Sequence, residues 1–226
     1  MFYETLDSNN GAIIGSVALK VIIPRCGNDW PAQDLNIAVP SKRLTSMSSF
    51  FLHRGFELTD TGVDIRYAIS DVHSFSVYER GRSRITISES AHDDSFISIV
   101  LASLHTAAMN FVTVNVICCF YPTITPSMQS CSFWNSRGLT DDQRQQVMSR
   151  GFDLITSSSQ LSKSCEDLCP STVRQLRGLR RIGLFHWHGS GVCNIGEMSY
   201  SWHIGEYCAN LGCPTRAFAA FARRFA

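Results

Sequence analysis

The chain has 226 residues, of which 44% are hydrophobic, and its formal net charge is +1. These values fit a folded domain with a sizeable core and exclude a disordered tail. A net charge so close to zero gives no overall electrostatic attraction to nucleic acid or to an anionic membrane.

Nine cysteines are present, and the N-terminal stretch MFYETLDSNNGAI has neither the basic segment nor the apolar segment of a secretory signal. We therefore expect an intracellular protein, cytoplasmic or nuclear, whose thiols stay reduced.

The first predicted elements place a Gly-Ser pair ahead of a strand. Residues 11–20 are predicted to form a short helix that contains Gly15 and Ser16. Several helix breakers follow, which predict a loop. The next segment, DLNIAV from Asp34 to Val39, is predicted to be a strand that ends at a proline.

Alternating helices and strands come next. Ser41 is a suitable N-cap for a helix that extends to about His53. Short strands are predicted over residues 63–69, 72–78 and 84–88. These elements indicate an α/β (α+β) fold, with a mixed sheet flanked by helices.

An uncharged stretch lies between Asp94 and Arg137, and it is long enough to be considered as a membrane span. Polar residues recur in it at roughly helical spacing, with apolar residues on the opposite face. This pattern predicts an amphipathic core helix over about residues 95–110 and no membrane span.

The remaining chain predicts a small C-terminal α+β region. We expect a core of residues 1–125 and an extension of residues 126–226 that is not clearly an independent domain. Its clearest element is a helix over residues 140–150, because acidic residues begin it where the helix dipole favours them. Residues 152–155 are predicted to form a strand.

A basic segment follows in this region. A helix that starts at Pro170 would place Arg174, Arg177 and Arg181 on one face. Such a face can hold phosphate or RNA, and it is also a common solvated surface.

The Gly15-Ser16 pair and the DLNIAV strand together resemble polymerase-β-like nucleotidyltransferases. In that family a Gly-Ser on a helix holds the nucleotide's phosphates, and the following strand presents two metal-binding carboxylates in a D-h-[DE]-h pattern, where h is apolar. The resemblance implies that Gly15 and Ser16 bind nucleotide, and that Asp34 binds Mg²⁺ and takes part in catalysis.

The same resemblance also points to a degenerate catalytic centre. Residues two apart on a strand point to the same face, so Asp34 and Asn36 project together. Asn36 stands where the second carboxylate is expected, and it offers a carbonyl oxygen without charge. The third carboxylate of the family comes from a later strand, for which Glu89 is the candidate and Asp93 an alternative.

Further segments are similar to a group of uncharacterised fungal proteins with a DLNI-V-P strand. They are Gly55-Phe56, the MNFVT stretch from Met109 to Thr113, and the YPTIT stretch from Tyr121 to Thr125.

A second candidate site is a C-terminal group of cysteines and histidines. Zinc takes tetrahedral nitrogen and sulfur ligands. Cys165 and Cys169 can supply one pair, and His186 or His188 with Cys193 the other. The spacing is irregular for a zinc motif, so reduced core thiols and surface histidines are the alternative.

Three hypotheses follow. The first is an inactive or divergent nucleotidyltransferase-fold protein, a pseudoenzyme, that binds nucleotide, RNA or a protein partner. The second is an active metal-dependent transferase that uses Asp34. The third is a zinc-stabilised interaction protein in which DLNIAV is incidental.

Overall fold

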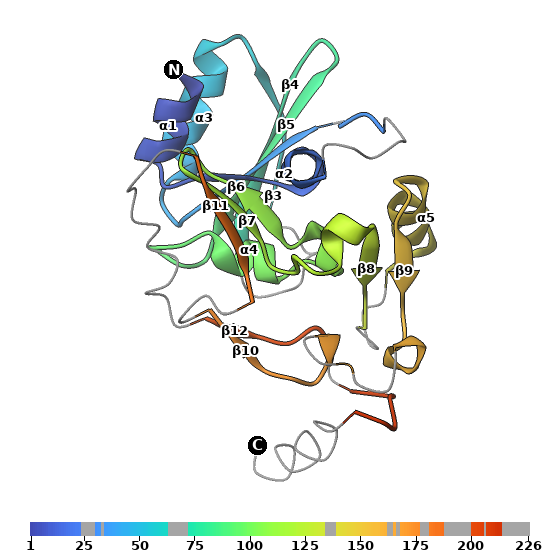
Figure 1. Cartoon of the computed structure of the whole chain (residues 1–226). Helices are drawn as coiled ribbons and strands as arrows, with labels where there is room; N and C mark the ends of the chain where they lie inside the picture. Colours follow the sequence, from blue (N-terminus) through green and yellow to red (C-terminus); the bar gives the residue numbers. More distant parts are fainter. Residues whose placement is uncertain are drawn as a thin grey trace.

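The computed structural model describes residues 1–23, 30–32, 34–62, 72–133, 139–161, 165, 168–176, 181–187, 200–205 and 207–213. At its centre is an eight-stranded sheet in the order β11-β7-β6-β1-β2-β5-β4-β3 (Figure 1). β2 and β5 pair in parallel, and the other neighbouring strands pair antiparallel. The expected mixed sheet flanked by helices is therefore confirmed.

The bounds of the elements are as follows. The strands of the large sheet are β1 (Ala12–Ile14), β2 (Leu35–Val39), β3 (Glu57–Gly62), β4 (Val72–Arg80), β5 (Ser83–Ser90), β6 (Asn110–Val112), β7 (Val116–Cys119) and β11 (Gly183–His186). The α-helices are α1 (Phe2–Ser8), α2 (Gly15–Ile22), α3 (Leu44–His53), α4 (Ile97–Leu101) and α5 (Asp141–Ser149). Short 3-10 helices are η2 (Thr106–Ala108), η3 (Thr125–Ser127) and η4 (Ser158–Gln160). Two small sheets pair β8 (Gln129–Cys131) with β9 (Asp153–Ile155), and β10 (Arg174–Gln175) with β12 (Ser201–Trp202).

The centre of the sheet is buried on both faces, as the alternation along β2 illustrates, whereas the edge strand β3 is exposed. Ile37 and Val39 join a cluster with the aromatic residues of α3, whereas Ala38 joins a separate cluster with α4, β6 and β7. The face that carries Ala38 also carries Asn36, because the two residues are two apart on one strand. None of the described helices is long and apolar enough to cross a membrane.

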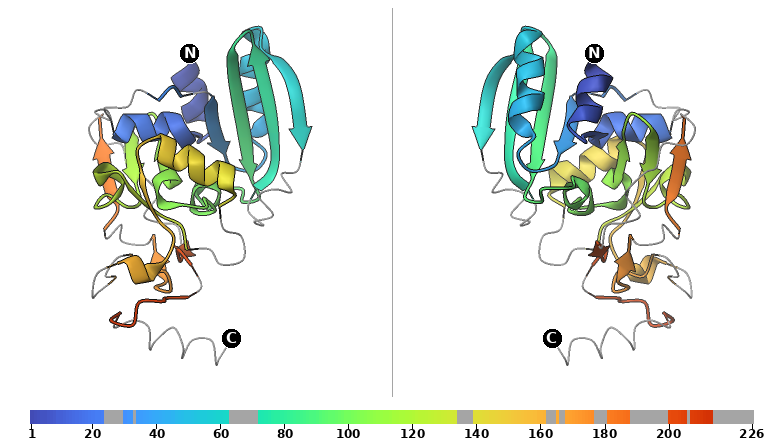
Figure 2. Two further views of the ribbon diagram at one scale, coloured as in Figure 1. Left: turned by 90° about the vertical axis from the view of Figure 1, so that its right-hand side faces the viewer. Right: turned by 90° about the vertical axis from the view of Figure 1, so that its left-hand side faces the viewer.

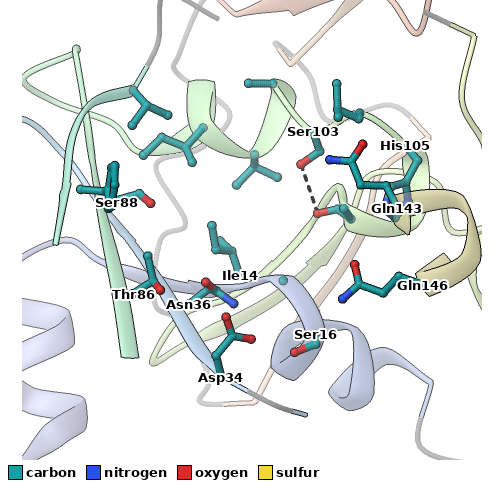
Figure 3. A pocket seen from close by; sticks show the side chains of 18 of the residues that line it. Ile14, Ser16, Asp34, Asn36, Thr86, Ser88, Ser103, His105, Gln143 and Gln146 are labelled. Atoms are coloured by element: carbon teal, nitrogen blue, oxygen red, sulfur yellow. Dashed lines mark hydrogen bonds between the residues drawn. The ribbon is translucent and has the colours of Figure 1, made fainter. Parts of the chain in front are cut away.

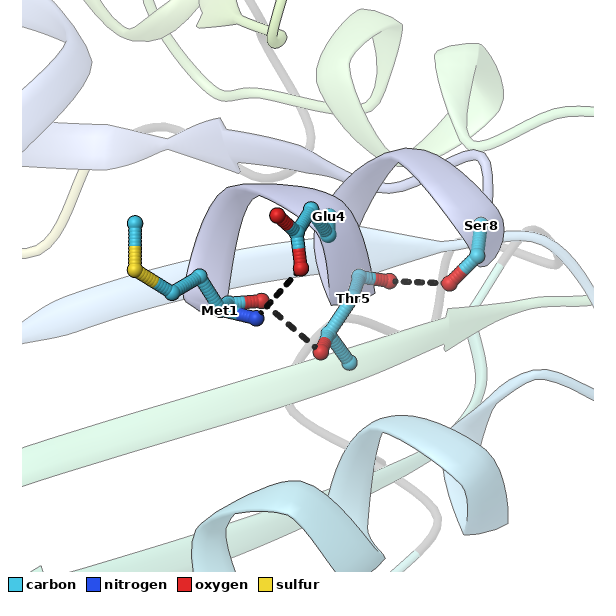
Figure 4. A network of polar contacts seen from close by, with 4 residues as sticks. All are labelled: Met1, Glu4, Thr5 and Ser8. Carbon is cyan, nitrogen blue, oxygen red and sulfur yellow. Dashed lines mark hydrogen bonds and ion pairs between the residues drawn. The ribbon is translucent and has the colours of Figure 1, made fainter.

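Helix α1 is an element that the sequence did not predict. It packs beside α3 (Figure 2). The ring of Phe2 lies 6.0 Å from that of Phe50. Polar contacts support its first turns (Figure 4): the Met1 amino group donates to Glu4 at 2.6 Å, and Thr5 donates to the Met1 carbonyl at 3.1 Å.

The helix predicted over residues 11–20 is wrong at its start. Residues 12–14 form strand β1, which pairs with β2 and β6, and α2 begins at Gly15. Gly15 adopts φ +69, a left-handed conformation that turns the chain from strand to helix and that glycine adopts without penalty. Three strand residues are too few to show the period-2 pattern in the sequence.

The helix predicted over residues 95–110 is also wrong. Only Ile97–Leu101 is α-helical, followed by η2, and Asn110–Val112 is a strand in the middle of the sheet. A run of β-branched and aromatic residues favours the strand here, and its burial on both faces imitates a helical apolar pattern.

The structure also corrects the predicted cap and basic helix. Arg43, rather than Ser41, is the N-cap of α3. Arg174 lies in the two-residue strand β10, and Arg181 has φ +69, so a helical arginine face does not form; Arg177 lies outside the described residues.

Part of the C-terminal region was predicted correctly. Thr140 caps α5 with a reciprocal pair of hydrogen bonds to Gln143, and β9 follows as expected. Through β11, residues of the extension also join the large sheet.

Candidate functional site

A cleft of about 380 Å³ opens beside the centre of the large sheet. Figure 3 shows that residues from α2, β2 and β5 line one side, and residues from α5 and the segment after α4 line the other. Gly15, Ser16, Asp34 and Asn36 all line this cleft. The structure thus brings the Gly-Ser pair and the polar end of the strand together, as the resemblance implies.

Gly15 and Ser16 form the N-terminus of α2, where backbone N–H groups are left without helical partners. A Cβ atom on Gly15 would lie 3.2 Å from the Asn36 Nδ2 atom, so this backbone packs closely against the Asn36 side chain. The Ser16 residue is 5% exposed, and its Oγ atom has no hydrogen-bond partner among the described residues. The cleft therefore contains an unused hydroxyl at the positive end of a helix.

The neighbouring strand presents hydroxyls where a carboxylate is expected. Asn36 is the register partner of Thr86 in the parallel β2–β5 pair, and Ala38 is the partner of Ser88. Thr86 and Ser88 line the cleft with Asn36. Hydroxyls and an amide can accept and donate hydrogen bonds, but they bring no negative charge to the site.

Glu89 lies elsewhere. It is not among the cleft-lining residues: its carboxylate accepts hydrogen bonds from Ser74 Oγ at 2.8 Å and from the Leu44 backbone N–H at 3.3 Å. Asp93, the alternative, is exposed and forms a salt bridge with Lys42 at 2.9 Å. The structure therefore brings neither carboxylate together with Asp34.

Asp60 is a cleft residue that the sequence did not suggest. It is opposite Val77 on β4, Val77 is opposite Thr86, and Thr86 is opposite Asn36. Three strand spacings separate Asp60 from Asn36, or about 14 Å between Cα atoms. The carboxylates of Asp34 and Asp60 are therefore too widely separated in the sheet to share one cation.

The opposite wall comes mainly from parts of the chain that sequence reasoning did not connect to the site. α5 contributes Gln143 and Gln146, and Arg150 follows at its C-terminal end. His105 lies beside them, with its Nδ1 atom 3.1 Å from the Ser130 hydroxyl. No local motif marks these residues, because only the tertiary fold brings α5 to β2.

Electrostatics on this wall favour a neutral histidine and a partly shielded arginine. Burial, and then the positive charge of Arg150, lower the pKa of His105 to about 4. Burial also lowers the pKa of Arg150, while the nearby Asp34 carboxylate opposes that shift. The Arg150 guanidinium lies 5.2 Å from the Trp30 ring centroid. A guanidinium held in this way keeps its charge and faces the cleft.

The predicted zinc ligands separate in the structure. Cys165 and Cys169 lie in a buried cluster with Cys208 and Cys213. His186 is instead in β11, at the edge of the large sheet opposite Val116, and it belongs to none of the metal-ligand groups formed by described residues. Cys193 and His188 lie outside the described residues.

No family model matches the sequence, and no curated protein is similar to it. Among solved structures, the chain is similar to a tRNA nucleotidyltransferase complexed with a primer tRNA and an incoming ATP analog, with 9% identity and a TM-score of 0.36. It is also similar to a structure of a tRNA-processing enzyme complex, with 10% identity and a TM-score of 0.35. Each match covers 50% of this chain, which spans only 31% and 29% of the length of those chains.

Proposed function

We propose that the chain is a divergent, inactive nucleotidyltransferase-fold protein that binds the phosphates of a nucleotide at the N-terminus of α2. The observation that carries the proposal is the buried Ser16 hydroxyl, which has no partner among the described residues and lines a cleft with Asp34 and Asn36. A buried hydroxyl without a partner is costly unless a ligand satisfies it. Phosphate oxygens suit it, because free N–H groups and the helix dipole favour an anion there.

The size of the cleft favours a nucleotide over a polymer. A volume of about 380 Å³ lies at the lower end of the ~300–1,000 Å³ range of small-molecule sites. Gln146 offers an amide that can hydrogen-bond the edge of a base, Gln143 offers the Nε2 donor that its cap of α5 leaves available, and Arg150 offers a cation for phosphate.

The cleft does not fit the two-cation centre of an active transferase. Such a centre needs several carboxylates around both metals. Asp34 is accompanied by an amide and two hydroxyls, and Asp60 lies several strands away. A single carboxylate holds Mg²⁺ weakly, so phosphate binding should depend on Arg150 and the helix terminus rather than on a protein-bound cation.

Equilibrium dialysis with ATP, GTP, CTP and UTP, in Mg²⁺ and in EDTA, tests binding. We expect binding of at least one nucleotide that persists in EDTA. Ser16→Ala should weaken it roughly 10–100-fold, the equivalent of about 1.5–3 kcal/mol for a hydrogen bond to a charged group. Ser76→Ala is the matched control, because Ser76 is also 5% exposed and lies outside the cleft. Absence of binding, or equal effects of the two variants, contradicts the proposal.

A second pair of variants tests the cation. Arg150→Gln should reduce binding, whereas Arg82→Gln, an exposed residue of the turn between β4 and β5 that does not line the cleft, should not. Competition by a short RNA but not by mononucleotides would identify a polymer site instead.

The absence of turnover is tested with labelled nucleotide and Mg²⁺ or Mn²⁺. Wild-type protein should show no transfer, and Asn36→Asp should make nucleotide binding stronger in Mg²⁺ than in EDTA, because it restores the second carboxylate. Turnover by the wild type that disappears in Asp34→Ala would establish an active transferase.

A further inference from the structure

Four cysteines of the C-terminal region form a compact buried cluster, distant in sequence but adjacent in space. Cys165, Cys169, Cys208 and Cys213 are each 5% exposed or less. The Sγ atoms of Cys165 and Cys208 are 3.7 Å apart, and those of Cys169 and Cys213 are 3.4 Å apart. The Sγ atoms of Cys165, Cys208 and Cys213 all lie within 4.8 Å of one another.

These distances fit a metal site and do not fit disulfides. A disulfide joins its sulfurs at about 2.05 Å, so the four side chains are thiols. Around a tetrahedral zinc ion with Zn–S bonds of about 2.3 Å, neighbouring sulfurs are about 3.8 Å apart. The Cys165–Cys208 and Cys169–Cys213 sulfur pairs are near this spacing, and Cys169 adjoins the group of three through Cys213.

We propose that Cys165, Cys169, Cys208 and Cys213 bind a structural zinc ion. Four thiolates are the soft ligands that tetrahedral zinc prefers, and no position is left for a water or substrate. An iron–sulfur cube would hold its four ligands farther apart than the sulfurs of this cluster. Two of the ligands differ from the set expected from sequence, since Cys208 and Cys213 replace His186 and Cys193.

Groups around the cluster are arranged to support thiolate ligands. Asn210 Nδ2 donates a hydrogen bond to Cys165 Sγ at 3.1 Å, and the Gly212 N–H donates one to Asn210 Oδ1 at 2.9 Å. The Arg174 guanidinium donates to the Cys169 carbonyl at 2.9 Å, which fixes the backbone beside that sulfur and places a positive charge near it. Such outer partners orient metal ligands and offset their negative charge.

Burial raises the pKa of the Cys165 and Cys208 thiols. Zinc binds the thiolate form of cysteine, so binding at this cluster would displace the thiol protons.

Among the described residues, regular structure beside the cysteines is short. β10 and β12 have two residues each, and Leu161 packs against the cysteine cluster. Leu176, Trp202 and Ile204 of the same region are buried in the main core instead. A zinc ion would join the segment that carries Cys165 and Cys169 to the segment that carries Cys208 and Cys213.

The test begins with the full-length wild-type protein, purified without chelator and without a metal-affinity tag. Elemental analysis should give stoichiometric zinc, and X-ray absorption at the zinc edge should show sulfur ligands alone at about 2.3 Å. Four results would each overturn the proposal. They are a zinc content near background after zinc supplementation, iron bound instead of zinc, a nitrogen ligand on the zinc ion, and disulfides between these cysteines in non-reduced peptide maps.

Variants then assign the ligands. Cys208→Ser should remove most of the zinc, and Cys131→Ser should keep it, because Cys131 is equally buried but lies in the main core. If Cys208→Ser fails to fold, Cys213→His provides a second measurement: it should retain zinc but introduce one nitrogen ligand in the absorption spectrum. Full zinc retention by Cys208→Ser, or an unchanged sulfur shell in Cys213→His, would exclude the proposed ligand set.

Discussion

Replacing Gly15 by alanine tests whether the strand-to-helix turn and the Asn36 contact act together. Gly15 has φ +69, and a left-handed conformation costs a residue with a Cβ atom about 1–2 kcal/mol. The new Cβ would also lie 3.2 Å from Asn36 Nδ2 and 3.5 Å from Asn36 Cβ. Moving Asn36 away from its rotamer adds about 0.5–1.5 kcal/mol. We expect Gly15→Ala to lower the free energy of unfolding by about 1.5–3.5 kcal/mol, the sum of these terms.

Gly81 is a matched control for the backbone term. It has φ +61 in the turn between β4 and β5, and a Cβ atom there would meet nothing within 4 Å. Urea denaturation followed by tryptophan fluorescence should show that Gly15→Ala is about 1 kcal/mol more destabilising than Gly81→Ala. Equal losses in the two variants would refute the reasoning, because the Asn36 contact would then contribute nothing.

Three further predictions concern stability. The pKa of His105 is about 4 in the folded state and about 6.5 in the unfolded chain, so the unfolded chain binds the proton first as pH falls. The free energy of unfolding should therefore keep its full value above pH 6.5 and fall by up to about 3 kcal/mol toward pH 4. His105→Gln should flatten this pH profile, and an unchanged profile would contradict the assignment. Thr140→Ala removes the side-chain cap of α5 and should cost about 1 kcal/mol, seen as faster hydrogen exchange in the first turn of α5; unchanged exchange there would be inconsistent with a role for the cap. Tyr121→Phe leaves the buried Trp202 Nε1–H without its acceptor at 3.0 Å, and it should lower the free energy of unfolding, measured by urea denaturation, by about 1–3 kcal/mol. The control Tyr3→Phe, at a residue that is 55% exposed, should change it by less than about 0.5 kcal/mol. Equal effects of the two variants would argue against the hydrogen bond.

The sequence predicted those parts of the fold in which local chemistry is sufficient. α5 was recognisable because Thr140 and the acidic residues after it form a helix start. β5 was recognisable because its apolar and polar residues alternate, with Ile85 and Ile87 in the core and Thr86 and Ser88 in the cleft. In both cases the signal is contained within one element.

Features that depend on tertiary contacts could not be predicted in the same way. Asp60 reaches the cleft only because β3, β4 and β5 pair in a particular register. Arg150 reaches it only because α5 packs across from β2. The cysteine cluster joins two segments far apart in the chain, whereas the predicted second pair, His186 or His188 with Cys193, is closer in sequence to Cys169. Sequence spacing does not indicate which pair folds against Cys165 and Cys169.

The charges of the cleft give a physical reason to expect binding without metal-dependent transfer. Carboxylates in an active centre repel a triphosphate, and two divalent cations are needed to reverse that repulsion. Here the cleft is lined by the carboxylates of Asp34 and Asp60 and by the guanidiniums of Arg84 and Arg150, and the α2 N-terminus adds a partial positive charge. Arg84 also pairs with Glu79 at 3.8 Å. A polyphosphate can therefore approach this cleft without the cations that an acidic centre requires. In the site proposed above, an amide and hydroxyls near Asp34 would hold a divalent cation weakly and, by the same electrostatics, would repel a phosphate less than carboxylates do.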